Sequence, residues 1–391
     1  MSKIVFFCIP AHGHTNPTLG VVRELVSQGH QVWYYSYNAF REKIEGAGAV
    51  FISCDSFDQE LRLSPEEAAR LGQDMALSAR VLAETTLALD ETICRHMKEL
   101  RPDCIVADSM AIWGKAAALK LGIPFVSSTT TFAFNRDSAK IMKQDRPPLL
   151  SLLISMIKAQ KQVNRLRKKG YPFRNMLDII SNAPDTHTIV YTSRQFQPAG
   201  HTFGDCYSFV GPSIRPVQEP FRKTGDTLVY ISMGTVCNDR LPLYRNCVEA
   251  FRGSSCQVVI SIGDSVDPSL LGPLPSNIQV FPHVDQMAVL QKADVFLSHC
   301  GMNSVNESLY FGVPLLMLPQ TTEQKGVARR VEQVGAGLFL PDTAPGTIRS
   351  AAETLLTEPS FRQKAQNIAQ SFRLCSGAKG AAWKILSVCE R

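Results

Sequence analysis

The stretch of sequence that decides the fold is FPHVDQMAVLQKADVFLSHCGMNSVNESLYFGVPLLMLPQTTEQ, residues 281–324. Within it, residues 295–298 form an apolar run with the length and the β-branched and aromatic content of a buried strand. A polar loop follows over residues 299–303, the pattern predicts a helix over about residues 304–311, and residues 313–318 predict a second strand. Strand, polar loop, helix and strand in this order are typical of an α/β domain.

The loop and the start of this helix favour the binding of an anion. A helix that opens with Gly301, Asn303 and Ser304 presents free backbone N–H groups, and its dipole attracts negative charge. An ordinary turn with polar caps is the alternative. We favour an anion site because polar residues gather at strand ends, where ligands of open α/β sheets bind. These residues are His299, Asn303, Ser304, Glu307, Glu323 and Gln324.

Length and composition set the class of protein. The 391 residues fit two domains of similar size, and a net charge of +6 without a dense basic stripe gives no reason to expect a nucleic-acid partner. The 11 cysteines include no Cys-x-x-Cys pair or metal-ligand spacing, and most lie in apolar runs. We interpret them as buried thiols in a reducing cytoplasm. No signal peptide or spanning segment is evident, so we expect a cytoplasmic protein without stable membrane insertion.

A second α/β pattern opens the chain. Residues 3–9 predict a strand, residues 10–17 a loop, residues 17–28 a helix with Asn16 as its N-cap, and residues 31–36 the next strand. The loop lacks the Gly-x-Gly-x-x-Gly fingerprint of nicotinamide-binding domains.

Two residues at strand ends in this half are candidates for catalysis. His14 lies in the loop after the first strand, and Asp108 ends a strand predicted over residues 102–108. A loop histidine can instead cap or pack, which is our interpretation of His12, and a strand-end aspartate can cap a helix. If His14 and Asp108 meet, the carboxylate would hold the tautomer of the imidazole and stabilise the imidazolium.

Several ordered motifs together resemble a known family. They are HVDQ at residues 283–286, ADVFLSHCGMNSVNE at residues 293–307, GVP at residues 312–314 and PQTTEQ at residues 319–324, with GHTNP at residues 13–17. They resemble the signature box of UDP-sugar glycosyltransferases with the GT-B fold, and in particular the bacterial macrolide-type enzymes. The resemblance implies an α/β fold of two Rossmann-like, doubly wound domains that face a cleft, with a C-terminal helix that crosses back to the N-terminal domain.

The domain boundaries follow from this resemblance and from composition. We expect an acceptor-binding domain over residues 1–211, a proline-rich linker over residues 212–224, a nucleotide-sugar domain over residues 225–372 and a returning helix over residues 373–391. The buried face of that helix is expected at Trp383, Ile385 and Leu386.

Two helical regions are predicted in the first half. Residues 56–98 are acidic and amphipathic, with a capping box at Ser64 and Glu67. Residues 149–169 are apolar and then basic, typical of a solvated helix face, with a membrane-surface helix as the alternative. The resemblance implies that these regions shape the acceptor pocket. Lining of that pocket and core packing both remain open for Phe132, Phe134, Met142, Leu149 and Met156.

The resemblance also implies roles for single residues. It places the catalytic base at His14, its orienting carboxylate at Asp108 and a diphosphate-contacting turn at Thr235. Glu307 would accept hydrogen bonds from both ribose hydroxyls, with Gln286 nearby. Other donor-site positions are His283 and Val284 at the base, His299, Gly301, Asn303 and Ser304 at the phosphates, and Glu323 and Gln324 at the sugar. Two departures are His283, where plant members carry tryptophan, and Asp285, where the box usually has proline.

The expected activity is inverting transfer of a sugar from a UDP-sugar to a hydroxyl of a small, largely apolar acceptor such as a phenol, flavonoid or macrolide. Gln324 favours UDP-glucose, since plant relatives with glutamine at this position tend to use glucose. Asp-x-Asp is absent from the sequence, so no metal is expected, and we expect a monomer or weak dimer. The alternatives are a sugar-nucleotide epimerase, a lipid- or sterol-directed glycosyltransferase at a membrane surface, and a non-catalytic partner that binds nucleotide-sugar.

Overall fold

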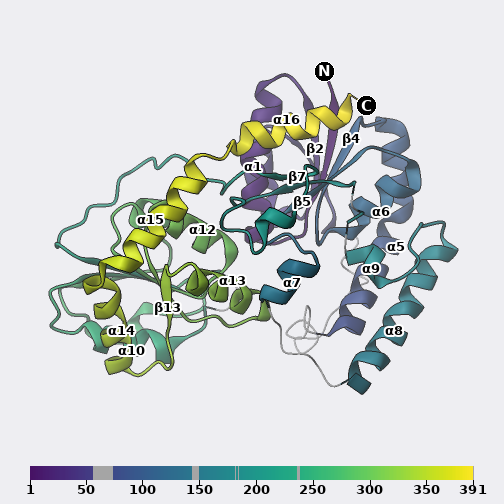
Figure 1. Cartoon of the computed structure of the whole chain (residues 1–391). Coiled ribbons are helices and arrows are strands. Elements are labelled where there is room, and N and C mark those ends of the chain that lie inside the picture. Colours follow the sequence, from purple (N-terminus) through teal and green to yellow (C-terminus); the bar gives the residue numbers. More distant parts are fainter. Residues whose placement is uncertain (56–73, 143–148, 181, 184, 236–237, 391) are drawn as a thin grey trace.

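The fold consists of two parallel β-sheets, each enclosed by helices (Figure 1). A computed structural model describes the chain except residues 56–73, 143–148, 181, 184, 236–237 and 391. In both sheets the neighbouring strands run parallel, and the strand order reverses after the first strand, as in a doubly wound fold. The expectation of two Rossmann-like sheets is therefore confirmed.

The first sheet is built by the N-terminal half. Its strands are β1 (Lys3–Phe7), β2 (Gln31–Ser36), β3 (Val50–Ser53), β4 (Cys104–Asp108), β5 (Phe125–Thr129), β6 (His187–Val190) and β7 (Tyr207–Phe209). They lie in the order β3-β2-β1-β4-β5-β6-β7. The α-helices that the structure describes in this half are α1 (His12–Ser27), α2 (Arg41–Glu45), α5 (Met75–Leu100), α6 (Ile112–Leu121), α7 (Arg136–Met142), α8 (Leu149–Lys168) and α9 (Met176–Ile180).

The second sheet is built by the C-terminal half. Its strands are β8 (Leu228–Ser232), β9 (Gln257–Ser261), β10 (Ile278–Phe281), β11 (Val295–Ser298), β12 (Leu315–Met317) and β13 (Gly337–Phe339), in the order β10-β9-β8-β11-β12-β13. The α-helices are α10 (Leu241–Phe251), α11 (Gln286–Leu290), α12 (Met302–Tyr310), α13 (Thr322–Gln333), α14 (Pro345–Thr357), α15 (Pro359–Arg373) and α16 (Gly377–Cys389).

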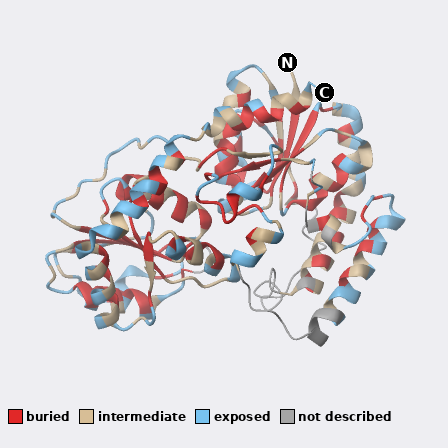
Figure 2. Ribbon diagram, viewed as in Figure 1, coloured by how far each residue is buried: buried red, intermediate tan, exposed pale blue. Residues whose placement is uncertain are grey.

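Strand β1 shows why the central strands are apolar without interruption. Successive side chains of a strand point to opposite faces of the sheet. Ile4 and Phe6 pack into the core that α1 and α16 cover, whereas Val5 and Phe7 pack into the core under α5 and α6. Both faces of the central strands are therefore removed from water, and Figure 2 shows these strands as mostly buried.

The final helix returns to the first half, as expected. α16 packs on α1, and Ala381, Ala382, Ile385 and Val388 join the core of the first sheet (Figure 1). The prediction for Trp383 was wrong, since its side chain is 69% exposed. The four core residues form one stripe at helical spacing, and Trp383 lies outside this stripe.

Other expectations need correction at element ends. α1 begins at His12 with Ala11 as its N-cap, so Asn16 is not the cap. The predicted box at Ser64 and Glu67 lies outside the described residues, whereas Asp74 caps α5 by accepting from two backbone N–H groups. Among the helices that the structure describes, none has a stretch long and apolar enough to span a bilayer.

Candidate active site

The candidate site lies where the carboxyl ends of the two sheets face each other. Asp108 ends β4 and α1 follows β1 on one side, while His299 follows β11 on the other. The two halves touch here, because Nδ2 of Asn303 in the first turn of α12 donates a hydrogen bond to the carbonyl of Gly13 at 3.2 Å. The polar loops predicted from the two α/β patterns therefore belong to one site.

Pro17 explains why the carbonyl of Gly13 is available. Pro17 lies inside α1 and lacks the N–H that would bond the carbonyl four residues earlier in the helix. That carbonyl is therefore without its helical partner and takes the amide of Asn303 instead. Because of Pro17, the carbonyl of Gly13 is thus a hydrogen-bond acceptor for a side chain from the second half of the chain.

His14 and Asp108 form a close pair. Nδ1 of His14 lies 2.8 Å from Oδ2 of Asp108 and 3.0 Å from Oγ1 of Thr130, and this hydroxyl also donates to Oδ2 at 3.5 Å. The Asp108 side chain is 1% exposed, whereas that of His14 is 22% exposed. Since a carboxylate only accepts, Nδ1 carries the proton and Nε2 keeps a free lone pair, the tautomer that a general base needs.

The surroundings of His14 favour its protonated form. Burial lowers the pKa of His14, but the charge of Asp108 and the hydrogen bond to it more than offset this, so the pKa is raised above its ordinary value. The carboxylate of Glu323, in the first turn of α13 on the opposite side, acts in the same direction. Charges from both halves of the chain therefore act on this imidazole.

Replacing Asp108 with asparagine should lower turnover and move the acid limb of the pH–rate profile to lower pH. The amide stabilises the imidazolium less, so the pKa of His14 falls toward its ordinary value, and the imidazole becomes a weaker base with a less defined tautomer. The pH dependence of kcat/KM checks both effects. A wild-type profile would show that Asp108 serves only to accept from the N–H of Met110 at 2.8 Å.

His299 is held between two glycines. A Cβ on Gly234 would lie 2.5 Å from Cε1 of the imidazole, and one on Gly301 would lie 2.6 Å from Nε2, so neither position has room for a side chain. Burial lowers the pKa of His299 to about 4, and the backbone of Ser232 acts in the opposite direction. Within the described part of the chain, its buried Nδ1 has no hydrogen-bond partner. The ring is therefore neutral and retains an unused polar atom.

The N-terminus of α12 offers further donors beside this imidazole. Its N-cap, Gly301, has no side chain to occupy the first backbone N–H groups, and Cys300 before it adopts a left-handed conformation with φ of 65°. Uncapped N–H groups at a helix start attract anions. A buried histidine with an unsatisfied nitrogen, next to an uncapped helix, fits the diphosphate of a nucleotide-sugar.

A third group surrounds Glu307 on the next turn of α12. Nε2 of Gln286 donates to Oε2 of Glu307 at 2.6 Å and to Oγ of Ser304 at 3.3 Å, and the hydroxyl of Tyr230 donates to Oε1 of Gln286 at 3.3 Å. Burial raises the pKa of Glu307 to about 7, against the opposing effects of Gln286 and Arg215. A carboxylate held here with free acceptor capacity fits a pair of sugar hydroxyls.

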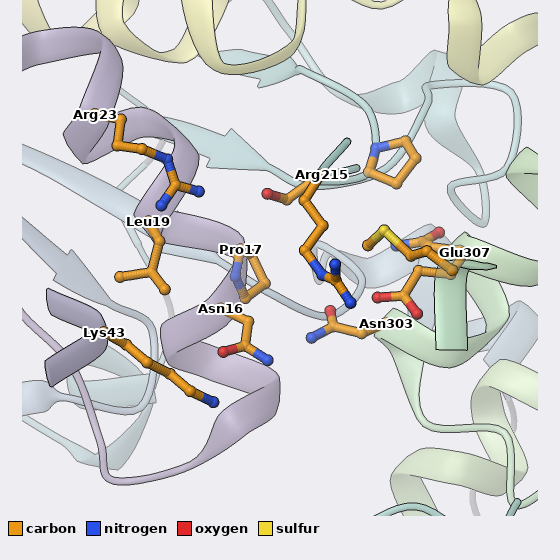
Figure 3. A pocket seen from close by; sticks show the side chains of 12 residues that line it. Asn16, Pro17, Leu19, Arg23, Lys43, Arg215, Asn303 and Glu307 are labelled. Atoms are coloured by element: carbon orange, nitrogen blue, oxygen red, sulfur yellow. The ribbon is translucent and has the colours of Figure 1, made fainter. Parts of the chain in front are cut away.

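A pocket of about 330 Å³ opens beside Glu307, between α1, α12 and the segment that joins the two sheets. Figure 3 shows Asn16 on the α1 side, with Asn303 and Glu307 opposite and the side chain of Arg215 between them. Its lining residues are Asn16, Pro17, Leu19, Arg23, Lys43, Pro212, Ser213, Arg215, Met287, Asn303, Asn306 and Glu307.

The remaining predicted donor-site residues, at positions 235, 283, 284, 323 and 324, do not line this pocket. His283 is exposed, and its Nε2 is 2.8 Å from Oδ1 of Asp264, while Val284 packs partly against the core of the second sheet. Thr235 is exposed beside the turn that holds Gly234. The side-chain oxygen Oε1 of Gln324 accepts from the backbone N–H groups of Gln320 and Thr321 at 2.8 and 3.1 Å.

Gln324 therefore has a structural role in addition to the predicted one. Oγ1 of Thr321 accepts from the N–H of Gln324 at 3.3 Å, which completes a capping box at the start of α13. The carbonyl of the side chain is thus engaged within the chain, and the amide nitrogen is the group left for a ligand. The contact of Glu323 and Gln324 with sugar stays a prediction.

The acceptor-side residues separate into buried and exposed groups. Phe132 is buried against Phe196, whereas Phe134 and Met156 are 63% and 53% exposed. Met142 packs against the core of the second half, and the side chain of Leu149 lies outside the described residues. Core packing therefore accounts for Phe132 and Met142.

Sequence reasoning missed two residues that the structure brings to the site, Thr130 and Arg215. Thr130 directly follows β5, so the rule that placed Asp108 at a strand end also applies to it. Arg215 lies in a proline-rich segment without regular structure, and no local pattern pointed to it.

Solved structures identify the class of protein. The crystal structure of the kitacinnamycin glycosyltransferase matches with a TM-score of 0.84 and 26% identity, over 99% of this chain and 98% of that one. Two doubly wound sheets with a site between their carboxyl ends, together with this match, make the chain a glycosyltransferase of the GT-B fold.

Sequence relatives identify the family. The NDP-glycosyltransferase YjiC of Bacillus licheniformis is 32% identical over 98% of this chain and 96% of its own length. The demethyllactenocin mycarosyltransferase of Streptomyces fradiae is 30% identical over 98% of this chain and 85% of its own length. Residues 251–374 match the family described as the C-terminal domain of erythromycin biosynthesis protein CIII-like proteins. The chain belongs to the bacterial macrolide-type NDP-glycosyltransferases, as the sequence motifs predicted.

Proposed function

We propose that this enzyme transfers a hexose, with glucose favoured, from a UDP-sugar to a hydroxyl of a small apolar acceptor, and that His14 is the general base. The observation that carries the proposal is the 2.8 Å contact between Nδ1 of His14 and buried Asp108, which leaves Nε2 available to take a proton. Relatives named as glycosyltransferases of macrolide-type products support an apolar natural product as the acceptor.

The chemistry is a single displacement. Nε2 of His14 takes the proton of the acceptor hydroxyl, whose oxygen forms a bond to the anomeric carbon. The bond from that carbon to the diphosphate oxygen breaks, UDP leaves with the electron pair, and the configuration inverts. His299 and the N–H groups of α12 stabilise the charge that develops on the diphosphate. Asp108 stabilises the imidazolium that results.

The donor roles are assigned in the same proposal. Glu307, with Gln286, takes the ribose hydroxyls. His283 and Val284 lie toward the base, Thr235, Gly301, Asn303 and Ser304 toward the diphosphate, and Glu323 and Gln324 toward the hexose. The domain boundaries given above, a cytoplasmic location and a monomer or weak dimer complete the proposal.

Product analysis tests the proposal. The enzyme is incubated with UDP-glucose, UDP-galactose or dTDP-glucose and a panel of phenols, flavonoids, macrolides and sterols, and products are read by mass and by the anomeric coupling constant. We expect β-glucosides from α-linked UDP-glucose. A retained anomeric configuration would refute the single displacement, preference for dTDP-glucose would refute the uridine assignment, and transfer confined to vesicle-embedded sterols would favour the lipid-directed alternative.

Transfer should be unaffected by a chelator. In this proposal His299 and the N-terminus of α12 stabilise the negative charge of the diphosphate. The described residues also include no cluster of three potential metal ligands. Initial rates measured with excess EDTA, and again after addition of Mg²⁺ or Mn²⁺, check this. A rate that disappears with EDTA and returns with the cation would contradict it.

A further inference from the structure

Asp285 replaces the usual proline of the box, and the structure shows what this carboxylate does. Oδ1 accepts from the N–H groups of Met287 and Ala288 at 3.1 and 3.3 Å and so caps α11. The same carboxylate accepts two hydrogen bonds from the guanidinium of Arg215, with Nη2 at 2.6 Å from Oδ1 and Nη1 at 2.9 Å from Oδ2. A proline at this position would allow neither contact.

Arg215 belongs to the segment that joins the two sheets, and its side chain reaches the donor site. It lines the same pocket as Asn303 and Glu307, and Figure 3 shows its guanidinium directed toward them. Two parallel hydrogen bonds fix the plane of an arginine side chain as well as its position. The joining segment is therefore fastened to the second half at the entrance of the pocket that holds Glu307.

Both neutral and charged groups surround Glu307. Gln286 is its neutral hydrogen-bond partner, and Ser304 and Tyr230 hydrogen-bond to Gln286 in turn. Asn303 and Asn306 lie on the same helix as Glu307. The charged neighbours are Arg215 and Asp285, while Arg23 and Lys43 line the α1 side of the pocket.

We propose that Arg215 is a positioning residue of the donor site: held by its two hydrogen bonds to Asp285 and directed into the pocket of Glu307, its guanidinium favours the carboxylate that accepts from the ribose hydroxyls and couples the joining segment to nucleotide binding. The inference rests on the proposed role of Glu307 in donor binding. Arg215 contacts no reacting atom in this scheme, because it acts through Glu307.

The two members of the pair act on Glu307 with opposite signs. The positive charge of Arg215 lowers the pKa of Glu307 and the negative charge of Asp285 raises it, while burial has the largest effect. If the pair of Arg215 and Asp285 had only a structural role, loss of either residue would loosen the same contact, and both substitutions would change UDP binding in the same direction. The directions of the two effects therefore separate an electrostatic role from a merely structural one.

The test measures the affinity for UDP between pH 5.5 and 9 by titration calorimetry. In wild type, affinity falls as pH drops through the pKa of Glu307, near 7, because the neutral carboxyl is a poorer acceptor. The pH at the midpoint of this fall in UDP affinity is called the break. In Arg215→Ala the break should move to higher pH, with UDP affinity about threefold to tenfold below wild type on the acid side and a smaller difference at pH 9. In Asp285→Asn, which keeps an N-cap oxygen for α11, the break should move to lower pH.

The control is Arg222→Ala, which removes an exposed arginine from the same segment and should leave the break unchanged. The titration of UDP itself is common to all variants and does not affect the differences between them. Equal weakening in both pair variants without movement of the break would overturn the inference, as would wild-type profiles in both. No UDP binding by wild type at any pH would instead overturn the proposed donor, and the inference with it.

Discussion

Replacing His14 with alanine should lower the rate of sugar transfer by about 10²–10⁴-fold or more while UDP binds as in wild type. General-base catalysis contributes factors of this size. The imidazole bonds to Asp108 and Thr130 in the first half, whereas the proposed UDP contacts lie on α11, α12 and the β8 turn. Turnover with UDP-glucose and a phenolic acceptor, together with calorimetric titration of UDP, measures the two effects separately.

His12 provides a matched control for this substitution. It lies in the same first turn of α1, is exposed, and its Nδ1 is 3.3 Å from Nζ of Lys43 rather than near Asp108. His12→Ala should keep most of the activity. Equal loss of turnover in the two variants, or parallel loss of UDP affinity and turnover in His14→Ala, would refute the assignment of His14 as the base.

Replacing Gly234 with alanine should weaken UDP binding by about tenfold to a hundredfold. The new Cβ would lie 2.5 Å from Cε1 of His299, and the φ of +78° at this position disfavours any side chain. The imidazole must then leave the position between Gly234 and Gly301 in which it is proposed to meet the diphosphate. A lost hydrogen bond to a charged group costs about 1.5–3 kcal/mol, which corresponds to this range of affinity.

Gly346 is the matched control, because an added Cβ there meets nothing within 4 Å. It lies in the first turn of α14, away from the proposed site, so Gly346→Ala should bind UDP as wild type does. Thermal unfolding of both variants distinguishes a local effect from a loss of fold. Wild-type UDP affinity in a folded Gly234→Ala variant would contradict the proposed contact of His299 with the diphosphate.

The sequence predicted those parts of the fold that depend on short-range pattern. The strands at residues 31–36 and 295–298 have the expected bounds, because each is an apolar run closed by polar or turn residues. The edge strands β3 and β13 were not predicted, since they are short and their side chains are only partly buried. The start of α1 was misplaced because Pro17 was taken as a first-turn residue, whereas it lies inside the helix.

The candidate site was predictable where a residue directly follows a strand. This rule and the family motifs located His14, Asp108 and His299, and the structure places them at the facing ends of the two sheets. Neither the rule nor the family motifs located the interactions that join segments far apart in the sequence. Thr130 reaches His14 across 116 residues of sequence and Arg215 reaches Asp285 across 70, and only the folded chain brings such pairs together.

The returning helix has a mechanical consequence. The polypeptide passes between the halves twice, once after β7 and once between α15 and α16, and the two passages touch where the N–H of Gly377 donates to the carbonyl of Val210 at 2.8 Å. Gly211 also lies so close to Cys375 that an added Cβ would be 2.6 Å from its Cβ. Further hydrogen bonds join the halves, from Nδ2 of Asn306 to the carbonyl of Tyr191 at 2.9 Å and from Nε of Arg330 to the carbonyl of Phe196 at 2.8 Å. Because the two crossings are tied together and lie beside these contacts, we expect relative movement of the halves to be a rotation about the crossings, with no sliding between the sheets.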